Sequence, residues 1–210
     1  QATPITANLF GIESLDNNTI MAVGDSGVVL RTTNGGDNWI LVQRQNGVLY
    51  TCIDFPSSNV GYICGTLGVI LKSTNGGLNW SQQVSGTGTS FLSQSFYNEN
   101  YGAVGGNAKI MLTTNGGLNW VNQNISFFPL DQIAGISQLD SNTVIGVANS
   151  SNGKQYKTTD GGLNWIGNSL GIPQLRGLTD AIRSMDFANT NTGMIVCDLG
   201  SIMKTINAGN

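Results

Sequence analysis

The sequence predicts an all-β fold, and three observations support this prediction. A segment of the type Thr-Asn-Gly-Gly-x-Asn-Trp recurs at intervals of 40 to 47 residues. Between its copies lie short apolar runs separated by turn-forming residues, and no segment has a persuasive helical pattern. A repeat of this length with four short strands is typical of a β-propeller blade. We therefore expect one domain, residues 1–210, forming a five-bladed β-propeller of four-stranded antiparallel blades.

The recurring segment, called the box below, is expected to form one hairpin in each blade. Its copies cover residues 31–39, 72–80, 112–120, 157–165 and, in degraded form, 204–210. The Asn or Asp can accept hydrogen bonds from its own turn, the two glycines tolerate positive φ, and the tryptophan can bury a large area under the hairpin. The expected structural residues are Asn34, Trp39, Asn75, Trp80, Asn115, Trp120, Asp160, Trp165 and Asn207.

The strands within a blade are expected between these turns. In the second unit they are predicted at 49–55, 61–65, 69–73 and 79–84. The fifth unit has no box tryptophan, so we expect the N-terminal residues 1–6 to supply the outer strand of the last blade and to close the ring. The long loop at 166–181 is expected to hold at most a short helical turn.

A column of small residues precedes the boxes and indicates a close approach of backbones in a crowded strand. It consists of Gly24, Gly65, Gly105, Ala148 and Cys197.

The boxes together resemble the Asp-box, or BNR, repeat. The upstream Gly-x-x-Gly, as in Gly24–Gly27, is most similar to the photosystem II stability and assembly factor-like repeat family. The resemblance spans essentially the whole chain. It implies a propeller and, because many members are secreted bacterial proteins, a secreted or cell-surface location. Asp-boxes also occur in sialidases, xyloglucan-degrading enzymes and sortilin-type receptors, so the resemblance implies the fold and leaves the function to be argued from a site.

Composition excludes several classes of function. Only 10% of residues are charged, the net charge is −3 and there is no histidine. Nine Lys and Arg residues scattered along the chain do not form a basic groove for nucleic acid. Histidine catalysis and histidine metal sites are ruled out, and no cofactor or metal is expected. No apolar run approaches the length of a transmembrane segment. The start at Gln1-Ala2-Thr3-Pro4 is expected to follow removal of a signal peptide.

The three cysteines do not form a disulfide-built scaffold, since three is both odd and few. Cys52 and Cys64 flank a predicted turn and would lie opposite each other in a hairpin. A disulfide and two buried reduced thiols both fit this placement.

Ligand-binding residues are expected on the face that carries the turns between the second and third strands and the loops between blades, around the central channel. The candidates are Asp25, Asn107, Asn149, Asp198, Arg176, Asp180, Arg183, Phe127 and Phe128. In a closed ring Asp25 and Asp198 would lie in neighbouring blades and could form the carboxylate pair of a glycosidase. We favour the alternative that both are turn residues.

Two further columns recur with the repeat. The basic column, Arg31, Lys72, Lys157 and Lys204, lies just before the box. It is expected to be a solvated strand position, with a charged ring for an acidic partner as the alternative. The polar column lies on the inner strands and is expected to cap backbone within its own blade, with a cation site as the alternative. It consists of Glu13, Asp54, Gln94, Ser137 and Asp186.

The function that these observations favour is non-catalytic binding of a glycan or a surface protein through the channel face. The second hypothesis is a structural subunit that self-associates when residues 1–6 donate a strand to the fifth blade of a neighbour. The third is a glycoside hydrolase-like propeller, and the fourth is a photosystem II assembly factor-like role.

Overall fold

The computed structural model describes residues 3–125, 131–149, 153–171, 174–175, 178–179 and 181–209, without the side chains of 174–175 and 178–179. This part of the chain is built from strands and turns, with two three-residue 3-10 turns, η1 (Asp25–Gly27) and η2 (Thr66–Gly68). No helix within it is long and apolar enough to span a membrane.

The strands in chain order are β1 Leu9–Ser14, β2 Ile20–Gly24, β3 Val28–Thr32, β4 Ile40–Gln43, β5 Tyr50–Asp54, β6 Gly61–Gly65, β7 Ile70–Ser73, β8 Ser81–Gln83, β9 Phe91–Phe96, β10 Gly102–Gly106, β11 Lys109–Thr113, β12 Val121–Asn122, β13 Gln132–Gln138, β14 Val144–Asn149, β15 Lys154–Thr158, β16 Ile166–Ser169, β17 Gln174–Leu175, β18 Leu178–Thr179, β19 Ile182–Phe187, β20 Gly193–Cys197 and β21 Ile202–Thr205.

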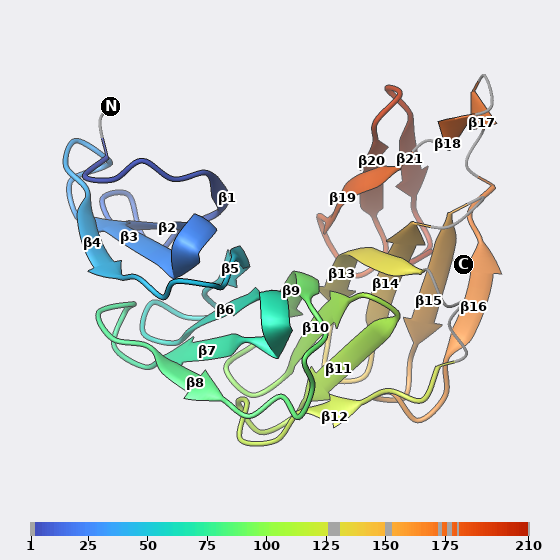
Figure 1. Ribbon diagram of the computed structural model, residues 1–210. Coiled ribbons are helices and arrows are strands. Elements are labelled where there is room, and N and C mark those ends of the chain that lie inside the picture. The colour runs from blue at the N-terminus through green and yellow to red at the C-terminus, as the bar shows by residue number, and fades with distance from the viewer. Residues whose placement is uncertain are drawn as a thin grey trace.

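These strands form five consecutive antiparallel sheets, which we call the first to fifth blades. The first four are β1–β4, β5–β8, β9–β12 and β13–β16, and the fifth has three strands, β19–β21. Figure 1 shows the blades following one another along an arc, with β1 in the first blade far from β19 in the fifth. The four strands predicted for the second blade are confirmed, and each observed strand begins and ends within two residues of its predicted bounds. The loop at 166–181 contains β16 and the hairpin β17–β18 where a helical turn was expected.

The core consists of apolar layers between neighbouring blades. Met21, Val23 and Val29 of the first blade pack against Ile53 and Ile63 of the second. Equivalent clusters join the second blade to the third, the third to the fourth and the fourth to the fifth. Because period-two alternation places apolar side chains on both faces of each sheet, every inner blade is covered twice.

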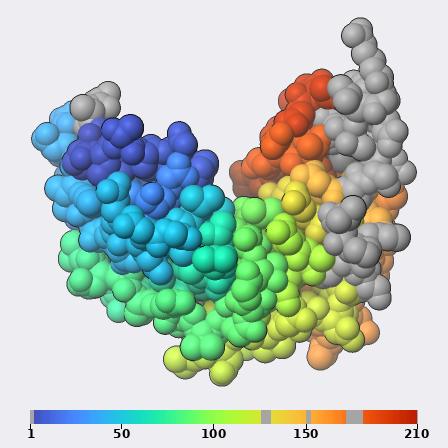
Figure 2. All heavy atoms as spheres, viewed as in Figure 1, coloured from blue at the N-terminus to red at the C-terminus, as the bar shows by residue number. Residues whose placement is uncertain are grey.

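The two ends of the arc do not meet, and the expected closure by the N-terminal strand is wrong for the described residues. The fifth blade has no fourth strand among them, and residues 3–8 form no strand. Instead Ile5 and Ala7 pack against Ala22, Val28 and Leu30, on the face of the first blade that has no neighbouring sheet. Figure 2 shows the first and fifth blades as two separate arms. The physical reason is that the apolar side chains of Ile5 and Ala7 bury themselves on their own blade.

One member of the small-residue column is misplaced in the prediction by a single position. Gly24 and Gly65 lie where an added Cβ would approach a carbonyl oxygen within 2.0 and 2.1 Å, and in the third blade this place belongs to Gly106. Gly102 pairs with Thr113 as Gly61 pairs with Ser73, so the turn after Gly106 is one residue shorter than its equivalents. Counting ten residues back from the box, as in the first two blades, therefore selects Gly105 where Gly106 is the equivalent residue.

Cys52 and Cys64 are directly paired across β5 and β6, with Cα atoms 5.5 Å apart, and they form a disulfide. The sequence left open a disulfide or two reduced thiols, and the structure has the disulfide. Cys197, in β20, is not part of this disulfide.

Candidate functional site

The box is a fold element, as predicted, and its hydroxyl hydrogen bonds recur in all five blades. In the third blade the Asn119 N–H donates to Asn115 Oδ1 at 3.0 Å. The Thr113 hydroxyl donates to the same oxygen and accepts from the Gly117 N–H at 2.9 Å. The fifth, degraded copy keeps the hydroxyl bonds, with Thr205 and Asn207. The Thr or Ser two residues before the box residue is thus a second anchor, which the sequence analysis missed.

A second recurring contact ties each box to the turn between the first and second strands. The N–H of the first box glycine, or of Ala208 in the fifth blade, donates to the carbonyl of an asparagine in that turn at 2.8 to 3.0 Å. The accepting residues are Asn18, Asn59, Asn100, Asn142 and Asn191. This periodic asparagine was readable in the sequence but was not singled out.

The basic column links successive blades, which corrects its expected role as a solvated position. Lys72 Nζ donates to the carbonyl of Gly116 at 2.6 Å, and Lys157 Nζ donates to that of Ala208 at 2.8 Å. Arg31 makes the equivalent contact with Gly76 at 3.3 Å. Each cation therefore reaches the box turn of the following blade. Lys204 is exposed, since no blade follows the fifth in the structure.

We expect Lys72→Met to lower the free energy of unfolding by about 1–2 kcal/mol, because a hydrogen bond to a charged group is lost and a half-buried carbonyl is left without its donor. Methionine keeps most of the apolar stem. The exposed Arg44→Met is the matched control and should change stability by less than about 0.5 kcal/mol. Urea unfolding followed by circular dichroism measures both, and equal effects would contradict the link.

Four of the five described candidates of the channel face have side chains bonded to other protein groups, and the fifth is Asn107. Asn8 Nδ2 donates to Asp25 Oδ2 at 2.7 Å. The Asn149 side chain holds the backbone of Ile182 in the next blade, accepting from its N–H at 2.7 Å and donating to its carbonyl at 3.3 Å. Asn107 is exposed, and its backbone pairs as a bridge with Gln132.

Asp198 and Arg183 form an exposed two-pronged ion pair, with Arg183 Nη2 donating to Asp198 Oδ2 at 2.6 Å. The hydrogen bonds from Arg183 lower the pKa of Asp198. Asp25 and Asp198 lie in the first and fifth blades, at opposite ends of the arc (Figure 1), and they are not brought together. Phe127, Phe128, Arg176 and Asp180 lie outside the described residues.

The inner strands of the arc share a feature that brings a different set of residues into consideration. Each inner strand, β1, β5, β9, β13 and β19, has a register break near its start. The residues skipped by the pairing are Phe10, Thr51, Leu92, Ala134 and Arg183. A bulge of this kind re-aims a side chain out of the alternation. Phe10 is 53% exposed, Leu92 36% and the Arg183 side chain 66%, so the inner surface offers two apolar groups and an ion pair.

Asp54 of the polar column joins neighbouring blades, which corrects the expectation for this member, whereas Asp186 caps its own strand by accepting from the Phe187 N–H at 2.8 Å. Asp54 Oδ2 accepts from the N–H of Phe96 in the third blade at 2.8 Å. Because Gly106 and not Gly105 is the small residue of the third blade, the column position there belongs to Ser95 and not to Gln94. The Ser95 hydroxyl accepts from the N–H of Gln138 in the fourth blade at 3.0 Å. Gln94 Nε2 donates to the carbonyl of Tyr62 in the second blade at 2.8 Å.

Burial raises the pKa of Asp54 to about 6 and outweighs the backbone hydrogen bonds from Phe96 and Phe55, which lower this pKa. Burial, followed by the nearby charge of Asp54, also raises the pKa of Glu13. Within the described residues no group of three acidic or cysteine side chains could hold a metal ion.

A pH dependence follows from the raised pKa of Asp54. Between pH 4 and 6 the Asp54 carboxyl holds a proton in the folded protein but releases it in the unfolded chain, where its pKa is near 3.8. The free energy of unfolding therefore falls as the pH rises through this window. Asp54→Asn keeps an acceptor for the Phe96 N–H and removes the buried charge. We expect this variant to be on the order of 1–3 kcal/mol more stable than the wild type at pH 7 and to lose most of the fall between pH 4.5 and 7.

Unfolding curves over this pH range test the prediction. The control is Asp16→Asn, because hydrogen bonds from the Asn18 and Thr19 N–H groups lower the pKa of exposed Asp16, so its contribution changes only at lower pH. A slope in Asp54→Asn that equals the wild-type slope would refute the assignment.

Comparison with known proteins agrees with this architecture. Residues 44–210 match the family described as photosynthesis system II assembly factor YCF48. The chain belongs to this family. No curated protein sequence matches it. The fold is similar to a structure titled "YCF48 bound to D1 peptide", at 18% identity and a TM-score of 0.72 over 99% of this chain and 66% of that one.

Two other solved structures show the same fold. YCF48 from Cyanidioschyzon merolae is 16% identical, with a TM-score of 0.51 over 100% of this chain and 98% of that one. An ancestral GH74 enzyme is 20% identical, with a TM-score of 0.73 over 96% of this chain and 31% of the enzyme. The chain thus spans about two thirds of the peptide-bound YCF48 and about a third of the enzyme. Membership in the YCF48 family confirms the resemblance inferred from the boxes.

Proposed function

We propose that this YCF48-family chain is a non-catalytic protein-binding module that takes an extended segment of a partner along the inside of its arc. The observation that carries the proposal is the register break repeated in all five inner strands, which leaves Phe10, Leu92 and Arg183 exposed at three of these breaks. Phe10 and Leu92 supply exposed apolar contacts there, and the Arg183–Asp198 pair supplies a charged one. A YCF48 structure is titled as bound to a D1 peptide, which supports a peptide as the ligand class here.

The experiment compares peptide capture by matched variants. The wild type is screened against a D1 peptide and against a phage library of random twelve-residue peptides. We expect selected peptides to lose affinity by about tenfold or more when Phe10 and Leu92 are both replaced by serine. The control replaces Leu118 and Leu163 by serine, since both are highly exposed and lie in box hairpins at the other end of the strands. Equal losses in both double variants would contradict the proposal.

Binding of a glycan is the competing outcome of the same experiment. A xyloglucan oligosaccharide is added as a third probe, because GH74 enzymes share the fold. If the wild type binds it and selects no peptide, the ligand class is wrong. A hydrolysed product would overturn the non-catalytic assignment. The strand-donation hypothesis is less supported, because Ile5 and Ala7 are already packed on their own blade.

We further propose a secreted or cell-surface location, supported by the Cys52–Cys64 disulfide, since such bonds persist in oxidising compartments. In protein isolated from its natural source and denatured without reductant, alkylation is expected to modify Cys197 alone. Mass spectrometry counts the modified thiols. Alkylation of Cys52 and Cys64 under these conditions would contradict the proposed location.

A further inference from the structure

Asparagine–glycine pairs recur along the chain, and among the described ones a single pair lies outside a box. The pairs begin at Asn34, Asn46, Asn75, Asn115 and Asn152. Residue 152 lies outside the described residues, and the pairs at Asn34, Asn75 and Asn115 belong to boxes. Such pairs are labile, because glycine has no side chain to hinder attack by its nitrogen on the asparagine side chain. The contacts around each pair therefore decide where this reaction proceeds.

The reaction is a hydrolysis that passes through a ring. The glycine nitrogen bonds to the asparagine Cγ, its proton passes to the amide nitrogen of the side chain, and that nitrogen leaves as ammonia. One water molecule then opens the succinimide ring at either carbonyl and gives aspartate or isoaspartate, so that a neutral amide becomes a carboxylate. Ring closure requires the glycine N–H to leave any acceptor that it bonds and the Cγ to swing onto the nitrogen.

The box holds the two reacting groups apart. In the third blade the Gly116 N–H donates to the carbonyl of Asn100 at 3.0 Å. The side-chain oxygen of Asn115 accepts from the Asn119 N–H at 3.0 Å and from the Thr113 hydroxyl at 3.1 Å. The glycine nitrogen is thus bonded into a neighbouring turn while the asparagine Cγ is fixed through its oxygen, and the ring cannot close until these bonds break.

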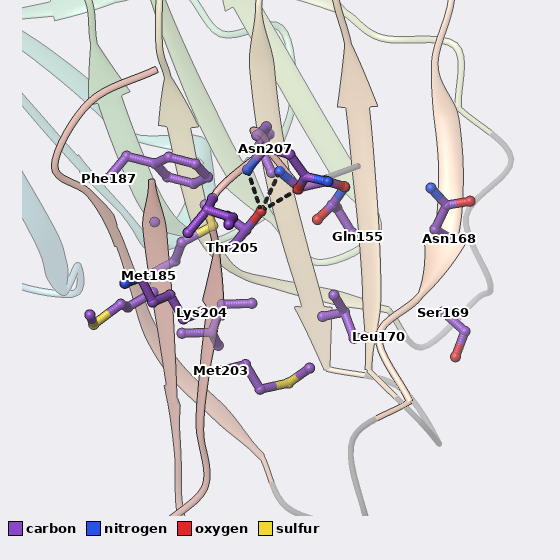
Figure 3. Close-up of a pocket in the computed structure, with 16 residues that line it drawn as sticks. Gln155, Asn168, Ser169, Leu170, Met185, Phe187, Met203, Lys204, Thr205 and Asn207 are labelled. Carbon is purple, nitrogen blue, oxygen red and sulfur yellow. Dashed lines mark hydrogen bonds between the residues drawn. The ribbon is translucent and has the colours of Figure 1, made fainter. Parts of the chain in front are cut away.

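The other described boxes with asparagine are protected in the same way. Asn34 and Asn75 accept the equivalent hydrogen bonds, and the N–H of the glycine that follows each donates to a turn carbonyl at 2.9 Å. In the fifth box Thr205 donates to Asn207 Oδ1 at 2.8 Å, a contact that Figure 3 shows. There Ala208 follows the asparagine, and its methyl group hinders the attack as well.

Asn46 lies in the loop between the first and second blades, where neither reacting group is held. Asn46 and Gly47 are both exposed. In the described part of the chain, neither the Asn46 side chain nor the Gly47 N–H makes a hydrogen bond. A Cβ added at Gly47 would meet no atom within 4 Å, so no neighbour obstructs the ring.

The residues on either side of this pair are anchored, so the tip of the loop can change while the fold stays intact. The Gln45 N–H donates to two carbonyls of η1 at 3.1 Å. Its side-chain Oε1 accepts from the hydroxyl of buried Tyr50 at 3.0 Å. On the other side, Val48 is 6% exposed and belongs to the core between the first two blades.

We propose that Asn46 is a modification site of the folded protein, at which attack by Gly47 and hydrolysis give aspartate and isoaspartate, while the boxes preserve their own asparagines. The new carboxylate lies two residues from exposed Arg44. Aspartate itself is compatible with a box, since Asp160 Oδ1 accepts from the Asn164 N–H at 2.9 Å. The box contacts therefore guard chiefly against isoaspartate, whose extra backbone methylene would disrupt the turn.

The test follows deamidation in the full 210-residue chain, kept folded at pH 8.5 and 37 °C. Trypsin then places the four described pairs in different peptides, because a lysine or arginine lies between every two of them. Tandem mass spectrometry measures the conversion of each asparagine, and an isoaspartyl methyltransferase with S-adenosylmethionine counts the isoaspartate. Asn46 is expected to convert about tenfold or more faster than the box asparagines, because these must first break their hydrogen bonds.

Two controls separate the fold from the local sequence. In urea all four pairs should convert at similar rates, since the box contacts are then absent. Thr113→Val removes the hydroxyl that bonds Asn115 Oδ1 and the Gly117 N–H. It is expected to speed conversion of Asn115 by about threefold or more and to leave Asn34 and Asn75 unchanged. Thermal unfolding shows that this variant is folded.

Two results overturn the proposal. One is a folded chain in which the box asparagines convert as fast as Asn46. The other is a folded chain in which Asn46 stays intact over the time in which it converts in urea.

Discussion

Trp120→Ala is expected to lower the free energy of unfolding by about 3–5 kcal/mol, the range for removal of a large buried aromatic side chain. Trp120 is buried in the seam between the second and third blades. Its ring meets Phe96 edge-on, and Phe96 stacks on Tyr62 of the second blade with centroids 3.8 Å apart. Removing the indole therefore opens a cavity at a joint between two blades. Urea unfolding followed by circular dichroism at a strand wavelength measures the loss.

Trp39→Ala is the matched control, since Trp39 belongs to the first box but faces no neighbouring blade and is only half-buried. Its loss should be clearly smaller, about 1–2 kcal/mol. Trp120→Phe separates packing from hydrogen bonding. The Trp120 indole nitrogen is buried without a partner among the described residues, so the phenylalanine variant should lose less than the alanine variant does. A Trp39→Ala loss as large as that of Trp120→Ala would argue against seam packing as the role of the box tryptophan.

Gly65→Ala is expected to cost about 3 kcal/mol, which is large for a single added methyl group. A Cβ at Gly65 would lie 2.1 Å from the Leu49 carbonyl oxygen. That oxygen cannot move freely, because it accepts the Thr66 N–H at 3.0 Å. The φ of Gly65 is ordinary for an extended residue, so the cost comes from the close approach of two backbones. The thermal unfolding midpoint and the urea midpoint should both fall.

Gly88→Ala is its control, because no atom lies within 4 Å of a Cβ added at this exposed glycine and its φ is not positive. There the change should be neutral or slightly stabilising, since alanine restricts the unfolded chain. If Gly65→Ala is as well tolerated as Gly88→Ala, the small-residue column does not mark a backbone contact.

The repeat made the blades predictable because its signals are local. Asn-Gly-Gly turns, box tryptophans and alternating apolar strands all act within a few residues, so the sequence order of the strands and the role of Asn115 or Asp160 follow from spacing alone. The all-β class, the antiparallel four-stranded blades and the family are confirmed, while the closure by the N-terminal strand is not. The paired placement of Cys52 and Cys64 also followed from the predicted turn, although their bonding did not.

The contacts between blades could not be predicted in the same way. Lys72 reads as a solvated strand residue until the following blade brings the Gly116 carbonyl beside it. Asp54 similarly reaches Phe96 across a seam. Register breaks such as the one at Leu92 depend on how two strands pair, which the period-two pattern does not encode. The exposed residues at these breaks were therefore missed, while the side chains of channel-face candidates such as Asp25 and Asn149 are bonded to other protein groups.

Small-angle X-ray scattering over a concentration series, with absolute mass from light scattering, tests the open five-bladed arc most directly. A compact 210-residue chain would have a radius of gyration of about 17 Å. The structure predicts a 22.1 kDa monomer with a larger radius and a pair-distance distribution extended by its two separate arms (Figure 2). A monomer with the compact radius and the symmetric distribution of a closed disc would contradict the arc and return the N-terminal residues to the fifth blade.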